Sequence, residues 1–173
     1  MIWCPTSFAE RIGAALAAPT AALSAADDPA HAGRASSDAT AVLLASAFAL
    51  HVRALVAAAW IGAVDSALAG VVAAAGVVGR AIGWDLAFLF IAGGVVTIAA
   101  GRRRAVGRDF DLAAVAYVPF AFVRLVAGFA AALAGGSLSR AATDVAGVAA
   151  LAWGGGAVAL AIRVARARGD ARG

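Results

Sequence analysis

The charged residues of this sequence are unevenly spread, and their spacing limits the folds that the chain can adopt. They concentrate in the first 38 residues, around 102–111, and after 162. A charge near the middle of a bilayer is costly, and a helix that crosses one needs about 20 mostly apolar residues. The chain is 64% hydrophobic and 14% charged, against about 45–50% and about 25% in soluble domains. We therefore predict an all-α, polytopic transmembrane bundle.

The apolar stretches predict four crossings, at 39–61, 85–101, 111–134 and 143–162. A further apolar segment, 62–83, is left open by the sequence: it crosses as a fifth helix, re-enters, or lies at the outer interface. Its glycines would allow close packing against neighbouring helices. Residues 39–162 are thus predicted to form the transmembrane domain, between an N-terminal region, 1–38, and a basic tail, 163–173.

The N-terminal region carries its own pattern. From Phe8 to Leu23, apolar side chains recur at roughly helical spacing, which predicts a short amphipathic helix on the membrane surface. Charges interrupt this run, so it lacks the apolar core of a secretory signal peptide. A polar linker follows over 24–38.

The positive charges predict the orientation. All 14 basic residues are arginine, and the alanine-, glycine- and valine-rich composition is typical of a GC-rich bacterial genome. One cluster, between the second and third crossings, consists of Arg102, Arg103, Arg104 and Arg108, and a second lies in the tail. Positive loops stay inside, so both are predicted to be cytoplasmic, at a bacterial inner membrane. The N-terminus is cytoplasmic with four crossings and outside with five.

Because the arginines flank apolar blocks, the net charge of +4 does not indicate nucleic-acid binding.

Arg124 lies near the middle of the third crossing, where a charge indicates a functional role. Tyr117 shares its helical face, and Pro119 is expected to bend the same helix or to free a backbone carbonyl in it. This predicts either a polar cavity lined by Arg124 or a packing role, in which Arg124 pairs with Asp65 or a backbone carbonyl.

Three other polar side chains, His51, Arg53 and Asp65, interrupt apolar stretches. A histidine and an aspartate in a membrane can relay protons, because histidine titrates near neutrality. The alternative is that His51 and Arg53 reach toward an interface.

Glycines in the last crossing, Gly154, Gly155 and Gly156, weaken a helix and predict either a kink or close packing. Four aspartates near predicted helix ends are interpreted as helix-start residues: Asp85, Asp109, Asp111 and Asp144. No phosphate loop, zinc-protease or nucleophile-elbow motif is present in the sequence. We therefore predict no catalytic, metal-binding or cofactor-binding residues.

The segment 101–125, GRRRAVGRDFDLAAVAYVPFAFVRL, resembles the loop and third helix of Yip1-like domain proteins. In that family a basic loop leads through a glycine and a charged–Phe step into a helix with aromatic–x–Pro near its start. The matching positions are Gly107, Phe110, Tyr117 and Pro119. Residues 8–23, FAERIGAALAAPTAAL, are also similar to the start of bacterial members. Two features depart from the family: it usually has five crossings, and its double glycine is reduced here to Gly107 before Arg108.

The resemblance implies a non-enzymatic polytopic protein, whose eukaryotic relatives organise membranes and bind trafficking factors. The small-residue composition independently favours a scaffold or accessory subunit that acts through helix–helix contacts with other membrane subunits or with itself. The alternative is a small transporter or channel subunit with a polar path near Arg124 and Asp65.

Overall fold

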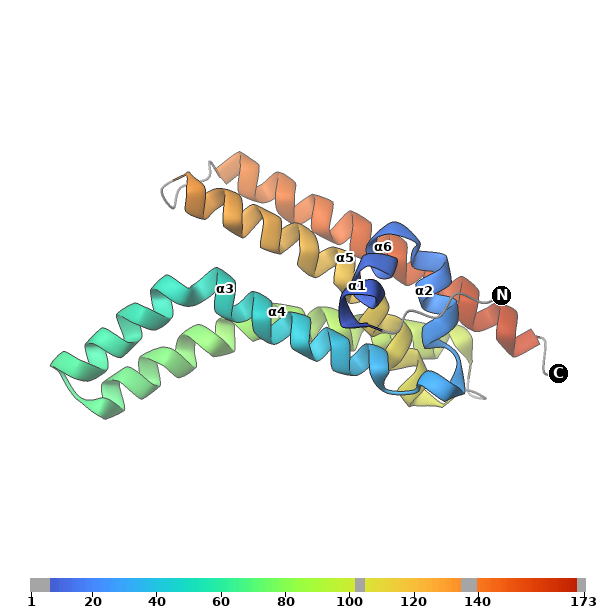
Figure 1. The fold of residues 1–173 in the computed structure, drawn as a ribbon, viewed down its shortest axis with the longest axis horizontal. Coiled ribbons are helices and arrows are strands. Elements are labelled where there is room, and N and C mark those ends of the chain that lie inside the picture. Colours follow the sequence, from blue (N-terminus) through green and yellow to red (C-terminus); the bar gives the residue numbers. More distant parts are fainter. Residues whose placement is uncertain (1–6, 102–104, 135–139, 171–173) are drawn as a thin grey trace.

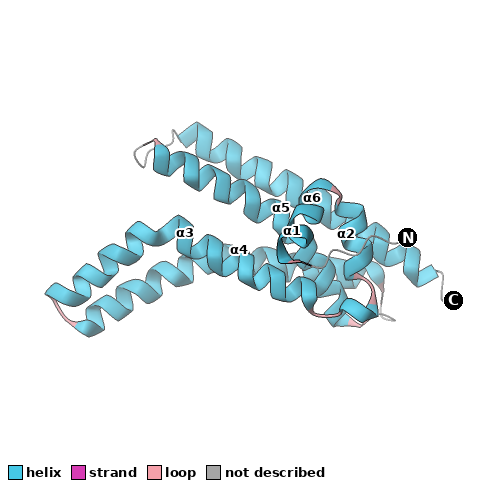
Figure 2. Ribbon diagram, in the orientation of Figure 1, coloured by secondary structure: helices cyan, strands magenta, loops and turns pink. Residues whose placement is uncertain are grey.

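The computed structural model describes residues 7–101, 105–134 and 140–170, and these form helices without a strand (Figure 1, Figure 2). The elements are α1 (Phe8–Ala17), α2 (Pro19–Ala26), the 3₁₀ turn η1 (Pro29–His31), α3 (Arg34–Val64), α4 (Ala67–Ala100), α5 (Val106–Leu133) and α6 (Arg140–Asp170). The all-α prediction is confirmed.

Four helical segments are long and apolar enough to cross a membrane, each with a mean hydropathy of 1.9. They are Pro29–Val64, Ala67–Ala100, Val106–Leu133 and Ala141–Ala167. Their length and composition are those of a multi-pass membrane protein, as the sequence predicts.

The predicted boundary between 62–83 and 85–101 is wrong. The chain turns at Asp65 and Ser66, and α4 then continues through both predicted segments as one helix of 34 residues. The Ser66 hydroxyl accepts the amide of Ala69 at 3.2 Å and so caps α4. A break at residue 84 would leave backbone groups without partners in an apolar setting, which is expensive. Within the described residues, 62–83 therefore forms no separate fifth helix.

The four long helices form two hairpins, α3–α4 and α5–α6, that diverge like the limbs of a V (Figure 1). The base, as the word is used below, is that side of the bundle where α3 and α5 start and where α4 and α6 finish. The N-terminal helices α1 and α2 pack against α5 at the base, and α2 also contacts α6. The described N-terminal and C-terminal segments therefore lie at the same end of the bundle, as an even number of crossings requires.

At the N-terminus, the sequence predicts one helix over 8–23, whereas the structure has two. Pro19 lacks an amide hydrogen and begins α2 at its first position, directly after α1 ends. Ser7 and Glu10 form a capping box that starts α1. The side chains of Ala14 and Ala15 are buried, on the face of α1 that packs against the bundle. Placement of α1 at the membrane surface stays a prediction.

Helix α5 is the central element, because it contacts each of the other five α-helices. Its first half is almost fully buried, and its buried side chains include four alanines, Ala113, Ala114, Ala116 and Ala121, which allow close helix approach. The helix runs through Pro119, whose side chain is buried, without interruption. In a similar way α6 runs through Gly154, Gly155 and Gly156 to Asp170, so the predicted tail begins as a continuation of this helix.

Candidate functional site

Arg124 on α5 forms an ion pair with Asp85 on α4, and Arg124 Nη1 donates to Asp85 Oδ1. The Asp85 side chain is 4% exposed and that of Arg124 is 26% exposed. The Arg124 guanidinium also lies over the Phe120 ring, 5.4 Å from its centroid. The hydrogen-bonded ion pair and the Phe120 ring thus hold a charge that would be costly alone in an apolar bundle.

The pairing differs from the sequence-based alternatives. Asp65, the predicted partner of Arg124, lies exposed in the turn between α3 and α4. Asp85 was interpreted as a helix start, yet it lies within α4 and faces the bundle. If 62–83 and 85–101 are read as one helix, Asp85 becomes a lone mid-helix carboxylate. A carboxylate in the middle of an apolar helix requires a positively charged partner, and this is the sequence signal that could have indicated the pair with Arg124.

Tyr117 lies two helical turns before Arg124 and is completely buried. Its ring contacts Phe88 and Phe120, with centroid distances of 6.2 and 6.1 Å. Its hydroxyl lies near Asp85 but makes no hydrogen bond of ordinary geometry with a described residue. The structure thus brings together Tyr117 and Arg124, as the helical spacing predicts.

His51 on α3 is half-buried and lies within electrostatic range of Asp85. Arg53 on α3 and Arg80 on α4 are exposed, and neither forms an ion pair with a residue in the described ranges. The sequence-based account did not single out Arg80. His51 therefore belongs to the surroundings of the ion pair, while Arg53 does not.

A cavity of about 420 Å³ lies beside Arg124, between α4, α5 and α6. Its polar lining groups are Arg124, Trp84 and Thr143; small and apolar side chains of α5 and α6 make up the rest. Because Asp85 neutralises Arg124, the cavity carries little net charge from this pair. The arrangement can hold a small polar molecule, but it offers no activated nucleophile.

The glycine triplet of α6 has a packing role at one position. A Cβ on Gly154 would lie 2.9 Å from Phe88 Cζ and 3.0 Å from Phe120 Cβ, whereas none of the surrounding atoms would lie within 4 Å of one on Gly155 or Gly156. Gly154 therefore permits α6 to approach the stacked rings of Phe88 and Phe120, whose centroids are 4.4 Å apart.

The base of the bundle has its own polar contacts. Asp111 accepts hydrogen bonds from Gly33 N at 2.7 Å, Ser36 N at 3.0 Å and Ser36 Oγ at 2.6 Å. It thereby caps α3 and does not start its own helix, which begins earlier, at Val106. Arg11 donates to both carboxylate oxygens of Asp38, at 2.5 and 2.8 Å. These hydrogen bonds raise the pKa of Arg11 and tie α1 to α3.

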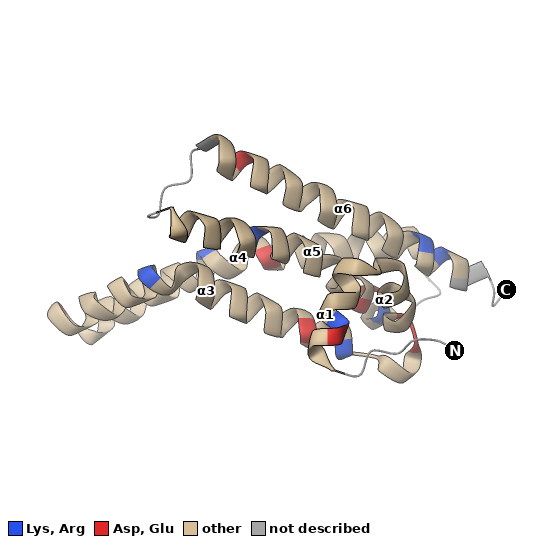
Figure 3. Cartoon of the chain, turned by 45° about the horizontal axis from the view of Figure 1, so that its top comes forward, with Lys and Arg blue, Asp and Glu red and all other residues tan. Residues whose placement is uncertain are grey.

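Charged residues gather around this base, while the helices beyond it carry few (Figure 3). Of the predicted orientation cluster, Arg108 is half-buried at the base. Arg102, Arg103 and Arg104 lie outside the described residues. Over the described ranges, the structure shows no group of three histidine, cysteine or acidic side chains arranged to hold a metal ion.

Comparisons of the chain with protein-family models, with curated proteins and with solved structures gave no match. The Yip1-like resemblance therefore stays a prediction.

Proposed function

We propose that this chain is a non-catalytic protein of the bacterial cytoplasmic membrane that serves as a scaffold or accessory subunit and binds a helix of another subunit. The observation that carries the proposal is the outer part of the α3–α4 hairpin, residues 54–79, which we call the arm. The arm diverges from α5–α6 (Figure 1) and has large apolar side chains in the open, such as Trp60, 72% exposed, and Leu68, 74% exposed.

The arm is built as one unit, and both of its helices carry exposed apolar side chains. Gly62 and Gly70 meet across it, since a Cβ on Gly70 would lie 2.5 Å from Gly62 Cα. On α4, Gly76, Gly79 and Gly83 share a face, and a Cβ on any of them would meet no atom within 4 Å. Glycines on an exposed apolar helix allow the backbone of a partner helix to come close.

The chemistry of the partner follows from two arginines. Arg53 and Arg80 are exposed where the arm begins, without an ion-pair partner in the described parts of the chain. An arginine in an apolar helix is stabilised by a carboxylate or by lipid headgroups. We therefore propose a partner of stated chemistry: an apolar transmembrane helix with an acidic residue at the depth of Arg80.

The test is extraction in a mild detergent followed by native mass spectrometry. We expect the wild-type chain to retain a second, different subunit in fixed stoichiometry. Gly79→Leu should abolish the complex by blocking the face of α4 that carries Gly76, Gly79 and Gly83, whereas Ala67→Leu, an exposed site about a third of a turn away from Gly79 around α4, should keep it. Leucine is a better helix former than glycine, so the first variant does not weaken α4. A lone wild-type monomer, a dimer of this chain alone, or equal retention by both variants would contradict the proposal.

A second candidate function, transport, is favoured by the cavity of about 420 Å³ beside Arg124. Gly147 lines this cavity and has room for a side chain. If the cavity forms part of a path, Gly147→Leu should block efflux of chloride or acetate from vesicles that contain the purified chain. Gly155→Leu, at an open position outside the cavity lining, is the control. Absence of efflux from the wild-type vesicles, or efflux that Gly147→Leu leaves unchanged, would count against transport.

A further inference from the structure

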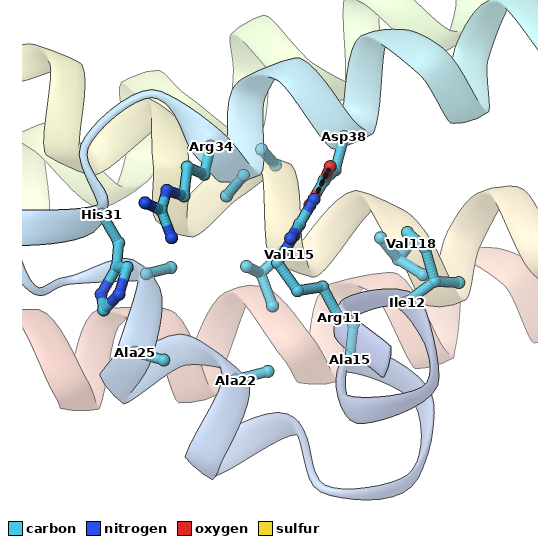
Figure 4. Close-up of a pocket in the computed structure, with 13 residues that line it drawn as sticks. Arg11, Ile12, Ala15, Ala22, Ala25, His31, Arg34, Asp38, Val115 and Val118 are labelled. Carbon is cyan, nitrogen blue, oxygen red and sulfur yellow. Dashed lines mark hydrogen bonds and ion pairs between the residues drawn. The ribbon is translucent and has the colours of Figure 1, made fainter. Parts of the chain in front are cut away.

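A pocket of about 50 Å³ lies at the base, beneath the N-terminal helices (Figure 4). Its walls come from α1, α2, η1, the start of α3 and α5, and they are mostly alanine and valine. One buried water needs about 10–15 Å³, so the pocket has room for a group the size of a phosphate. Arg34 and His31 line one side, and the Arg11–Asp38 pair lines the other (Figure 4).

The charges of these walls do not cancel. Asp38 neutralises Arg11 through two hydrogen bonds. Arg34 has no ion pair with any residue that the structure describes, and its guanidinium points into the pocket (Figure 4). A cationic fork over a small cavity favours a phosphate or carboxylate group.

An apolar groove of about 250 Å³ lies beside this pocket, between α3 and α5. Pocket and groove share Ile12 and Val118 in their linings. Beyond these two residues the groove is lined by Phe8 of α1, by small and apolar side chains of α3, Ala41 to Ala49, and by those of α5, up to Phe129. From Val118 to Phe129 the α5 backbone rises roughly 16 Å, which matches a long stretch of hydrocarbon chain.

We infer that pocket and groove together bind one anionic phospholipid, with its phosphate at Arg34 and an acyl chain along the groove between α3 and α5. The groove runs from the base toward the other end of the bundle, which is the direction of the acyl chains in a surrounding bilayer. The arginine-rich base is the end where a headgroup would lie. The inference is independent of the arm and of the function proposed for it.

The test is native mass spectrometry of the full chain reconstituted in equimolar phosphatidylglycerol and phosphatidylcholine and then released in detergent. We expect one retained phosphatidylglycerol. Arg34→Ala should lower its retention about fivefold to tenfold. Arg163→Ala, which removes an exposed arginine of α6 outside the pocket lining, is the matched control and should have little effect.

A second pair of variants tests the groove without changing any charge. Ala45→Trp places a large side chain in the groove and should also lower retention, whereas Ala54→Trp, exposed on the same helix outside the lining, should not. Equal retention of both lipids, or retention unaffected by Arg34→Ala, would overturn the inference. Displacement of the lipid by inorganic phosphate, together with no effect of Ala45→Trp, would show an anion site without an acyl groove and would overturn it too.

Discussion

Arg124 and Asp85, 39 positions apart in the sequence, form an ion pair that joins α5 to α4. Both residues belong to helices that are long and apolar enough to span a membrane. In such a setting each charge requires the other. The pair therefore helps to hold the α3–α4 hairpin against α5–α6 through a contact between α4 and α5.

Removing one member of the pair should be worse than removing both. Arg124→Leu leaves the Asp85 carboxylate without its partner, and we expect a loss of about 3 kcal/mol in unfolding free energy. In the double variant Asp85→Leu, Arg124→Leu, most of this loss should be recovered. Unfolding in a denaturing detergent, measured for both single variants and the double variant, checks this. Additive losses would show that the two side chains act independently.

Gly154 and Gly155 should respond oppositely to the same substitution. A methyl group at Gly154 meets Phe88 and Phe120 at about 3 Å, and overpacking of this kind costs about 1–3 kcal/mol. At Gly155 the methyl group meets no other atom within 4 Å, and alanine strengthens a helix by up to about 1 kcal/mol over glycine. Thermal unfolding of Gly154→Ala and Gly155→Ala in detergent gives the comparison. A similar change in both midpoints would refute the packing role of Gly154.

The cap that Asp111 provides to α3 should be measurable by hydrogen exchange. Asp111→Ala removes three hydrogen bonds and leaves the amides of Gly33 and Ser36 without an acceptor. We expect a loss of about 1–3 kcal/mol and faster exchange in the peptide that begins at Gly33. Asp144→Ala, which alters an exposed carboxylate on α6, is the control. Unchanged exchange around Gly33 would show that the cap is dispensable.

Single cysteines should report the topology. With Cys4 replaced by serine, Ser37→Cys and Ala167→Cys lie at the base, and Asp65→Cys lies at the opposite end of α3–α4. An impermeant maleimide on intact cells should label only Asp65→Cys, because the arginine-rich base is expected to face the cytoplasm. Labelling of residues 37 and 167 from opposite sides would contradict an even number of crossings. Labelling of both from outside would reverse the orientation.

The helical fold could be predicted because its signal is local: about 20 apolar residues in succession define a span. The ion pair could not, since its signal lies in two helices. Asp85 resembles a helix boundary because a carboxylate inside a span is costly, and only the position of Arg124 in the folded bundle offsets that cost. The role of Asp111 was missed for the same reason, because the amides that it caps lie 75 and 78 residues earlier in the sequence.

Other sequence features left the choice between bending and packing open. Pro119 and the glycine triplet of α6 were each compatible with a broken helix, yet both helices continue. Tertiary neighbours decide such cases: Gly154 is surrounded by aromatic rings that require a small residue there. The sequence contains the glycine and both phenylalanines, but it does not show that the two rings lie against Gly154.

The unequal lengths of α4 and α5 make bilayer thickness a variable that acts on α4 more than on α5. With 34 residues, α4 is roughly 51 Å long, about 20 Å more than a typical hydrocarbon core. With 28 residues, α5 is roughly 42 Å long. Tilt, local thickening of the lipid or protrusion must absorb the excess, each at an energy that rises with the mismatch. A thicker membrane therefore relieves more mismatch at α4 than at α5, and it would draw the protein toward regions where the bilayer is thickest.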